Sequence, residues 1–521
     1  MRTGSRTYGL VAVILLVTAC STGTTSSGAT YPSSLKIALS TTLQSFDPRV
    51  AQPLAKLHLD LMYDHLVGTN ADETAVSKNT GIASNWSTTD NTTWQFTLRN
   101  NFHFSNGQPL TADDVQFSLQ RLLQPQATAA YATYFKSEKL QVTVQSPTAL
   151  TIVLATPSFA LPLYLSSIMG NEGDVIPKAY VQQNGDAYFN LHPIGSGPYI
   201  LASVTTGVSI VYQATGKPHP ILGTPRYKTV EFDQVVSDPT RVAQLQTGGA
   251  DMIDIGDFSE LQQLTGSTYR IEQKPGSNII GIGLAEQWKN TPNSNQDFRE
   301  ALSLAINVGD INTALFGGRG KLTGVYPVGP QAIGFKDINP YPYDPAQAKT
   351  LLKSSNYNGA AIDLYAWPQS GLPGAQRVTE AIQQDWAAIG VNVNLITTDQ
   401  ATYIGKWVSY KLNFAASAVA IANRPLGLSV YQGQFYSTGS STYTHDPNID
   451  SLVQQLVAAQ SDTQATGALT QQVDQYIHDH YLTIPLIQLG SFYAVKSASI
   501  PQWSLGGGQY DINVRAMVSG S

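Results

Sequence analysis

The chain of 521 residues contains a single cysteine, Cys20, so no disulfide can form within it. Its stability must come from large hydrophobic cores, and its length and 42% apolar residues suit two or three domains. The eight histidines include no His-x-x-x-His pair, and no second cysteine could complete a structural zinc site. We therefore expect neither a resident metal nor another cofactor.

Charged residues are scarce, at 13% of the chain with a net charge of −6, against about a quarter in ordinary proteins. Basic blocks are absent, so we expect no binding to nucleic acid. Few carboxylates also leave little charge to change in acid. This composition fits an acidic habitat or, equally, a drift towards Gln, Thr and Ser.

The N-terminal apolar run, residues 10–17, is shorter than the roughly 20 residues that span a bilayer. It follows two arginines and precedes small residues, which is typical of a secretory signal peptide over residues 1–19. Val17-Thr18-Ala19-Cys20 resembles a bacterial lipobox, which implies that Cys20 carries the lipid anchor. Residues 20–32 are mostly Ser, Thr and Gly, which predicts a flexible tether. The expected location is extracytoplasmic, with the protein lipid-anchored to the cell membrane in the periplasm or at the outer face.

Strand and helix patterns alternate along the rest of the chain. Residues 94–98 alternate as a half-buried strand, and residues 111–114 read as a capping box that starts a helix. A helical stripe over residues 378–389 stops at Gly390, and residues 391–395 alternate again as a strand. These repeated units predict a two-lobed α/β protein.

Enzyme motifs do not survive inspection. Gly317-Gly318-Arg319-Gly320-Lys321 lacks the first glycine and the final hydroxyl of a phosphate-binding loop. Gly195-Ser196-Gly197 lacks the spacing of a nucleophile elbow. A glycosidase needs two carboxyl groups about 5–9.5 Å apart, and the sequence nominates no such pair. We therefore predict that the protein is not an enzyme.

The surviving motifs follow one another in a characteristic order. They are Ser45–Pro48, Tyr63–Val67, Trp94–Arg99, Phe102–Gly107, Leu110–Val115, His192–Tyr199, Gly249–Met252 and Phe298–Leu302. Together they resemble the extracellular solute-binding proteins of the peptide/nickel class (family 5), the capture subunits of bacterial ABC importers. The resemblance covers nearly all of the chain after the tether.

This resemblance implies a periplasmic-binding-protein fold (type II, cluster C-like) with two lobes joined by two crossings. Lobe I would combine residues 33–70, 186–275 and 486–521, with residues 71–185 as its extra domain, and residues 276–485 would form lobe II. The expected function is capture of an oligopeptide or related solute by hinge closure of a monomer. An ABC permease and its ATPase would receive the solute.

The sequence departs from dipeptide-binding members of that family at the expected ligand site. Asn423 stands where those members carry an aspartate for the peptide's amino group, and the segment around Gln369 lacks an arginine for its carboxylate. Breaking a buried ion pair of this kind costs about 3–5 kcal/mol. We therefore hypothesise that the ligand is not a small zwitterionic peptide. Longer peptides, an oligosaccharide and a metal chelate remain open, as does a surface-anchored hydrolase on the same fold.

The candidate ligand-binding residues combine neutral amides, one cation and several aromatic rings. The amides are Gln369 and Asn423, and the cation is Arg424. Aromatic side chains suit stacking on apolar or sugar faces. The aromatic candidates are Phe46, Tyr131, Trp367, Tyr403, Trp407, Tyr431 and Phe435. Six aromatic residues are expected near the cleft: Trp367, Tyr403, Trp407, Tyr431, Phe435 and Tyr436. We expect two or three of these six to touch the ligand and the others to belong to the core.

Overall fold

The computed structural model describes residues 33–41, 43, 45–51, 55–273, 278–367, 374–412, 416–422 and 425–500, with Met1, Trp503, Leu505, Gly506, Asn513 and Arg515. Internal contacts divide the chain into two units, Met1–Thr30 and Tyr31–Ser521, and the helices and strands of the described residues belong to the second. None of the helices in these ranges is both long and apolar enough to cross a bilayer. The predicted signal peptide, the tether and Cys20 lie outside the described residues.

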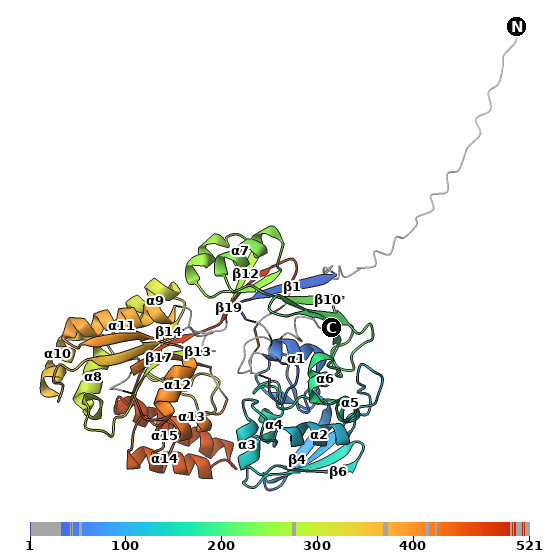
Figure 1. The fold of residues 1–521 in the computed structure, drawn as a ribbon, viewed down its shortest axis with the longest axis horizontal. Coiled ribbons are helices and arrows are strands. Elements are labelled where there is room, and N and C mark those ends of the chain that lie inside the picture. Colours follow the sequence, from blue (N-terminus) through green and yellow to red (C-terminus); the bar gives the residue numbers. More distant parts are fainter. Residues whose placement is uncertain are drawn as a thin grey trace. The chain divides into compact units, whose positions relative to one another are not determined.

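A mixed sheet of seven strands is built around β1 (Ser34–Leu39), which runs parallel to both of its neighbours, β10 and β11. Its strand order is β12-β19-β11-β1-β10-β9-β8. Figure 1 labels β12, β19, β1 and β10 of this sheet. The other strands are β8 (Tyr199–Thr205), β9 (Ser209–Ala214), β10 (Thr229–Gln234), β11 (Met252–Asp254), β12 (Tyr269–Gln273) and β19 (Phe492–Lys496). Buried apolar residues of β1 and β10 pack into the core of this sheet.

The second large sheet has six strands in the order β14-β18-β13-β17-β15-β16. Its strands are β13 (Asn278–Leu284), β14 (Lys321–Leu322), β15 (Ile362–Ala366), β16 (Val393–Thr397), β17 (Ala416–Ala422) and β18 (Thr483–Leu489). All seven residues of β18 are buried, as expected for a strand covered on both faces. β15, β16 and β17 run parallel to one another.

The chain crosses between these two sheets twice. It leaves the first sheet after β12 and enters the second at β13, and it returns between β18 and β19. The two crossings are neighbours, because Gln273 pairs with Phe492 on one side and Asn278 pairs with Leu489 on the other. This arrangement confirms the predicted two-lobed α/β fold with two crossings. The domain limits remain predictions, and β18 extends past residue 485 while still pairing in the six-stranded sheet.

A third sheet of four antiparallel strands has the order β4-β5-β7-β6. Its strands are β4 (Ala83–Thr88), β5 (Thr93–Leu98), β6 (Gln141–Ser146) and β7 (Ala149–Val153), and a small separate pair joins β2 (Gly68–Thr69) to β3 (Val76–Ser77). In β5, Trp94, Phe96 and Leu98 are buried and alternate with exposed residues, as the sequence predicts. This buried face packs in one core with Val115 and Leu119 of α2 (Ala112–Arg121).

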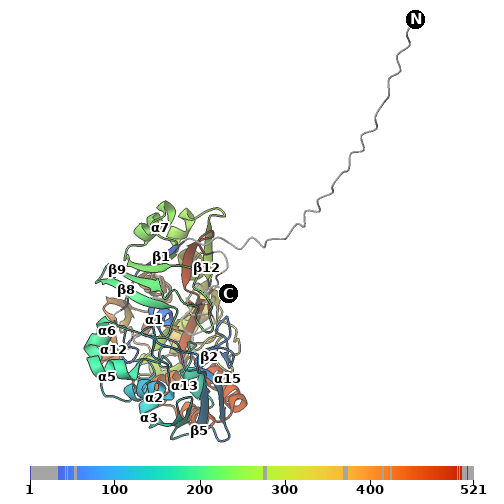
Figure 2. The ribbon, with the colours of Figure 1, turned by 90° about the vertical axis from the view of Figure 1, so that its right-hand side faces the viewer.

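The remaining helices connect and cover these sheets (Figure 1). They are α1 (Lys56–Met62), α3 (Ala132–Ser137), α4 (Leu161–Tyr164), α5 (Lys178–Asn184), α6 (Asp186–Leu191), α7 (Asp238–Thr247), α8 (Gln296–Leu304), α9 (Val308–Phe316), α10 (Pro345–Ser354), α11 (Ala375–Ile389), α12 (Gln400–Val408), α13 (Leu428–Gln434), α14 (Pro447–Ala458) and α15 (Thr463–Asp479). α5 and α6 lie side by side (Figure 2) and meet at Gly185, whose φ of 84° lets the chain turn sharply between them. Short 3₁₀ turns cover Phe258–Gln263 and Pro292–Ser294.

Candidate ligand-binding site

Three parallel strands of the six-stranded sheet, β17, β15 and β16, end at the same edge of that sheet. Ligands of open α/β sheets bind at the carboxyl ends of parallel strands. Trp367 directly follows β15, and the loop after β16 leads into α12. Asp399 caps that helix by accepting a hydrogen bond from the Thr402 backbone N–H. This edge therefore collects side chains from separate segments of the sequence.

Four aromatic rings at this edge contact one another in series, and we call Trp367, Tyr403, Trp407 and Tyr443 the aromatic cluster. The rings of Trp367 and Tyr403 stack with centroids 4.5 Å apart. Tyr403 and Trp407 are four residues apart on α12, which places both on one face of the helix. Trp407 in turn stacks on Tyr443 at 5.1 Å. The structure thus brings together three of the predicted residues and adds Tyr443.

Hydrogen-bond donors lie buried in the aromatic cluster and at the neighbouring Tyr326. The indole Nε1 atoms of Trp367 and Trp407 and the hydroxyl of Tyr326 are buried, without a hydrogen-bond partner among the described residues. Burial raises the pKa of Tyr326, so its hydroxyl stays protonated. Leaving a buried donor unsatisfied costs about 1–3 kcal/mol. A bound acceptor would recover this free energy, which favours this edge as a binding site.

Two glycines of β13 make room for the tyrosine rings. A Cβ atom on Gly281 would lie 2.5 Å from the ring of Tyr326, and one on Gly283 would lie 2.2 Å from the hydroxyl of Tyr443. Residues two apart in a strand point to the same face. Gly281 and Gly283 therefore let both rings lie directly against the backbone of β13. Glycine inside a strand often marks such a close approach.

Replacing Gly283 by alanine is expected to displace Tyr443, because the new Cβ would also lie 2.5 Å from the ring carbon that bears the hydroxyl. Overpacking of this kind lowers the free energy of unfolding by about 1–3 kcal/mol. Chemical denaturation measures this loss, and near-UV circular dichroism reports the altered stacking of Trp407. Gly433→Ala is the matched control, since its Cβ would meet nothing within 4 Å. An equal loss of stability in both variants would contradict the prediction.

Two further predicted residues, Tyr431 and Phe435, lie in the same hydrophobic core as the aromatic cluster, whose members Trp367, Tyr403 and Tyr443 are themselves at most 3% exposed. Neither has any exposed surface, and Phe435 packs edge-on against Tyr443. The Tyr431 hydroxyl donates a 2.6 Å hydrogen bond to Oδ1 of Asp474 on α15. Burial raises the pKa of Asp474 to about 7. In this conformation both aromatic residues support the packing of the cluster.

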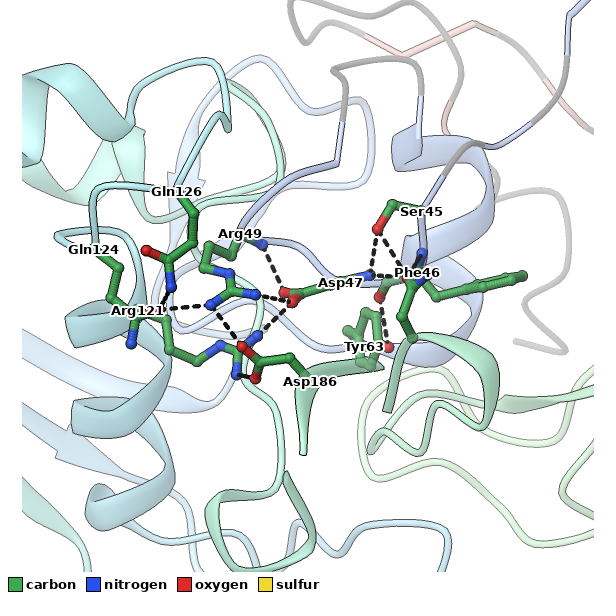
Figure 3. A network of polar contacts seen from close by, with 10 residues as sticks. Ser45, Phe46, Asp47, Arg49, Tyr63, Arg121, Gln124, Gln126 and Asp186 are labelled. Carbon is green, nitrogen blue, oxygen red and sulfur yellow. Dashed lines mark hydrogen bonds and ion pairs between the residues drawn. The ribbon is translucent and has the colours of Figure 1, made fainter. Parts of the chain in front are cut away.

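Phe46 lies in the loop after β1, in the core of the seven-stranded sheet. Its backbone N–H donates to Asn190, and its carbonyl accepts from the hydroxyl of Tyr63. Figure 3 shows its ring pointing away from a charged network that begins at the next residue, Asp47. Phe46 is 8% exposed. The structure does not bring it to the aromatic cluster.

The charged network around Asp47 holds this loop in place (Figure 3). Arg49 and Arg121 both donate to the Asp47 carboxylate. The same two guanidinium groups also pair with Asp186 at the start of α6. Asp47, Arg49 and Arg121 are nearly fully buried, whereas the Asp186 side chain is 44% exposed. The motif residue Asp47 therefore has a structural role, joining the loop to α2 and α6.

Tyr131 precedes α3 and belongs to the core of the four-stranded sheet. Its ring lies edge-on to Tyr164 with centroids 5.1 Å apart, and its backbone N–H donates to Glu172. It is 7% exposed and is not part of the aromatic cluster. Ligand contact by Tyr131 and by Phe46 stays a prediction.

Gln369, Asn423 and Arg424 lie outside the described residues. In the chain, residues 368–373 follow Trp367, and residues 423–424 follow the end of β17. Sequence reasoning missed Tyr326 and Tyr443. The available signal was the Gly-x-Gly spacing of β13, but a strand pattern does not name the rings that fill the space.

Comparison with known proteins places this chain in a family. The model of the bacterial extracellular solute-binding proteins, family 5, matches residues 79–443. The chain is 27% identical over 369 residues to heme-binding protein A of Haemophilus influenzae, covering 66% of this chain and 65% of that protein. It is 28% identical over 371 residues to the dipeptide-binding protein of Escherichia coli K12, covering 66% and 67%. The matched part is therefore just under two thirds of heme-binding protein A.

A solved structure supports the fold. The ABC transporter substrate binding protein CtaP from Listeria monocytogenes superposes with a TM-score of 0.79 at 19% identity. The match covers 94% of this chain and 99% of that one. At this identity the likeness establishes the two-lobed architecture alone.

Proposed function

Since this chain belongs to the bacterial extracellular solute-binding proteins of family 5, we propose that it captures a solute outside the cytoplasm for an ABC importer. The proposal includes delivery to a permease and its ATPase, and no chemical change in the solute. It also includes anchoring by a lipid on Cys20, which the sequence Val17-Thr18-Ala19-Cys20 supports. The observation that carries the binding role is the aromatic cluster with its unused donors at the carboxyl edge of β15 and β16.

The chemistry of this edge suggests what the solute carries. The members of the aromatic cluster are uncharged, and the indole N–H groups of Trp367 and Trp407 can only donate. A flat or apolar group bearing a hydrogen-bond acceptor would stack on the rings and accept from these donors. Asn423 in place of an aspartate argues against capture of a free amino group. We therefore propose a longer peptide or a related compound, held through carbonyl groups and apolar side chains.

Binding would draw the two lobes together around the crossings. A ligand that touches both lobes favours the closed state by its differential affinity for the two states. The paired flanks of the two crossings, Gln273 with Phe492 and Asn278 with Leu489, support a narrow hinge. Small-angle scattering should therefore report a smaller radius of gyration when ligand is present, and an unchanged radius would count against closure.

Trp407→Phe tests the ligand site, because it removes an unpartnered N–H while keeping an aromatic ring. We expect Kd to rise by roughly 2- to 13-fold, the equivalent of one hydrogen bond worth about 0.5–1.5 kcal/mol. Stability should change little. Titration calorimetry measures Kd with the compound that mass spectrometry identifies in the natively purified protein.

Trp386→Phe is the matched control for that experiment. Trp386 is fully buried in α11, and its Nε1 donates a 3.0 Å hydrogen bond to the carbonyl of Leu302. Its replacement should lower stability and leave Kd unchanged, the opposite of Trp407→Phe. If Trp407→Phe leaves Kd unchanged, the ligand does not use this donor and the proposed site is wrong.

A surface hydrolase on the same fold gives a different result when the protein is incubated with peptides and oligosaccharides. Capture predicts thermal stabilisation by a ligand that is recovered intact. Release of cleaved products would refute the transport proposal.

A further inference from the structure

A second group of polar residues lies in the core near α1, away from the aromatic cluster. It consists of Asp60 on α1, His65 shortly after that helix, and Asp174 in the segment before α5, and we call it the Asp–His–Asp cluster. His65 Nδ1 lies 3.3 Å from Asp174 Oδ1 and 3.8 Å from Asp60 Oδ1. Each residue is at most 3% exposed. One ligand atom from each residue lies within 4.8 Å of the other two.

The backbone fixes the position of two of these side chains. His65 and Asp174 face each other in an antiparallel bridge. On either side, the Leu66 N–H donates to the carbonyl of Gly173, and the Val175 N–H donates to that of Asp64. Side chains that face each other across an antiparallel bridge lie on the same side. The approach of His65 to Asp174 therefore follows from main-chain pairing.

The hydrogen bonds of His65 determine which of its nitrogens faces the carboxylates. Its Nε2 lies 2.9 Å from the carbonyl oxygen of Gly170, which can only accept, so Nε2 carries the proton. In the neutral ring, Nδ1 then directs a lone pair at Asp60 and Asp174. Metal-binding histidines are oriented in this way, with the other ring N–H donated to a backbone carbonyl.

The carboxylate oxygens of the cluster are buried and unused. Both oxygens of Asp60, both of Asp174 and Nδ1 of His65 lack a hydrogen-bond partner in the described part of the chain. Buried polar atoms are nearly always paired with protein, water or an ion. One of these atoms from each residue lies within 4.8 Å of the other two, and this set of unpaired acceptors indicates a missing positively charged partner.

The neighbouring cations are paired mainly with other carboxylates. Lys56 lies 2.6 Å from Glu73 and more distantly, at 3.8 Å, from Asp60. Arg515 pairs with Asp64 at 3.0 Å. Two cations thus offset two carboxylates, which leaves Asp60 and Asp174 with a combined formal charge of −2.

Two other residues, His219 and Glu172, border this region, and neither neutralises the carboxylates of Asp60 and Asp174. His219 contacts Asp64 through Nε2, and its Nδ1 accepts backbone N–H bonds from Ile221 and Leu222. With one nitrogen accepting, the His219 ring is neutral. Glu172 lies two residues before Asp174, accepts one backbone N–H and leaves its second oxygen unpartnered among described groups. Neither residue adds a positive charge beside Asp60 and Asp174.

We propose that the Asp–His–Asp cluster binds one divalent transition-metal ion through His65 Nδ1 and a carboxylate oxygen each from Asp60 and Asp174. Ligand atoms about 2.0–2.2 Å from an ion lie roughly 3–4 Å apart, which matches the observed separations. An imidazole ligand favours zinc and its neighbours over calcium or magnesium. The ion would fasten α1 to the segment before α5.

Metal analysis and X-ray absorption of the wild-type chain test this site without any substitution. After EDTA treatment, addition of Zn²⁺ and removal of the excess, we expect about one zinc per chain and an unfolding temperature raised by several degrees. The absorption spectrum should show one imidazole nitrogen with oxygen ligands and no sulfur. Cys20→Ser, which removes the single thiol, should leave the stoichiometry unchanged. Substoichiometric zinc, or a site lacking imidazole, would overturn the proposal.

Substitutions distinguish this site from adventitious binding. His65→Gln and Asp174→Asn should each weaken Zn²⁺ binding by more than about 100-fold. His103→Gln removes an exposed histidine as the control and should bind as the wild type does. In EDTA, Asp174→Asn should be at least as stable as the wild type, because it replaces a buried carboxyl group that has no hydrogen-bond partner among the described residues. Undiminished Zn²⁺ binding by the two cluster variants would refute the assignment.

Discussion

Replacing Asp47 by asparagine should lower the free energy of unfolding by about 3–5 kcal/mol, the usual cost of breaking a buried ion pair. The substitution keeps the size of the side chain and removes its charge. Arg49 and Arg121, 8% and 4% exposed, would then lose their buried counter-ion and keep the half-exposed Asp186. The loop carrying Phe46 would lose its attachment to α2 and α6. Urea denaturation measures the loss.

Asp337→Asn is the control for this prediction. Asp337 pairs with Lys321 at 2.7 Å, but both side chains are more than half exposed. Exposed pairs contribute about 0–1 kcal/mol, because solvent screens them. Equal effects of the two substitutions would mean that the Asp47 network contributes no more than an exposed ion pair.

Asp474→Asn should flatten the dependence of stability on pH. The folded pKa of Asp474 is raised to about 7 by burial, whereas an unfolded aspartate titrates near 3.9. Between about pH 4 and pH 7 the folded protein holds a proton that the unfolded chain releases. The contribution of Asp474 is therefore complete below pH 4 and is lost as pH rises through 7, by about 4 kcal/mol in total. The variant lacks this loss.

Denaturation at several pH values between 5 and 8 measures the difference in slope between wild type and Asp474→Asn. Asp479→Asn is the control, since Asp479 ends the same helix and its side chain is 54% exposed. Identical slopes in Asp474→Asn and the wild type would contradict the raised pKa. A protein that is more stable in mild acid also agrees with the sparse carboxylates of its sequence. The comparison of unfolding midpoints at pH 3 and pH 7 tests that habitat directly.

Sequence reasoning succeeded where an interaction spans only a few residues. Asp114 accepts the Thr111 backbone N–H at 2.9 Å, as the predicted capping box requires. Gly390 ends α11 with a φ of 100°, a value that glycine adopts freely. The alternation of β5 is confirmed for the same reason, because one face of a strand is set by its own pattern. Local chemistry determined these features.

The predicted strand at residues 391–395 begins two residues later, at Val393. The Val391 N–H donates to the carbonyl of Trp386 and so completes the end of α11. Asn392 instead donates its N–H to the hydroxyl of Tyr357. Pairing with β15 starts only at Ile362 with Val393. Whether residues 391 and 392 end the helix or start the strand therefore depends on Tyr357 and β15, which lie outside the local sequence pattern.

The aromatic cluster and the Asp–His–Asp cluster could not be predicted in full from the sequence for the same reason. Trp367, Tyr403 and Trp407 could be nominated because aromatic residues are conspicuous in a sequence, but their partner Tyr443 belongs to a distant segment. The Asp–His–Asp cluster escaped notice because Asp174 lies over a hundred residues from His65 and no short spacing connects them. Such sets form only when the chain folds. Contacts of long range therefore carry most of the binding chemistry proposed for this molecule.

The adjacency of the two crossings has a consequence for protein engineering. The segment from residue 278 to residue 489 begins and ends at neighbouring points in space, since Asn278 and Leu489 are paired with each other. Gln273 and Phe492 are likewise paired, so a short turn could reconnect β12 to β19 as a hairpin. The whole segment is thus suited to exchange between related proteins. A chimaera made in this way would join the two parts at the two neighbouring crossings.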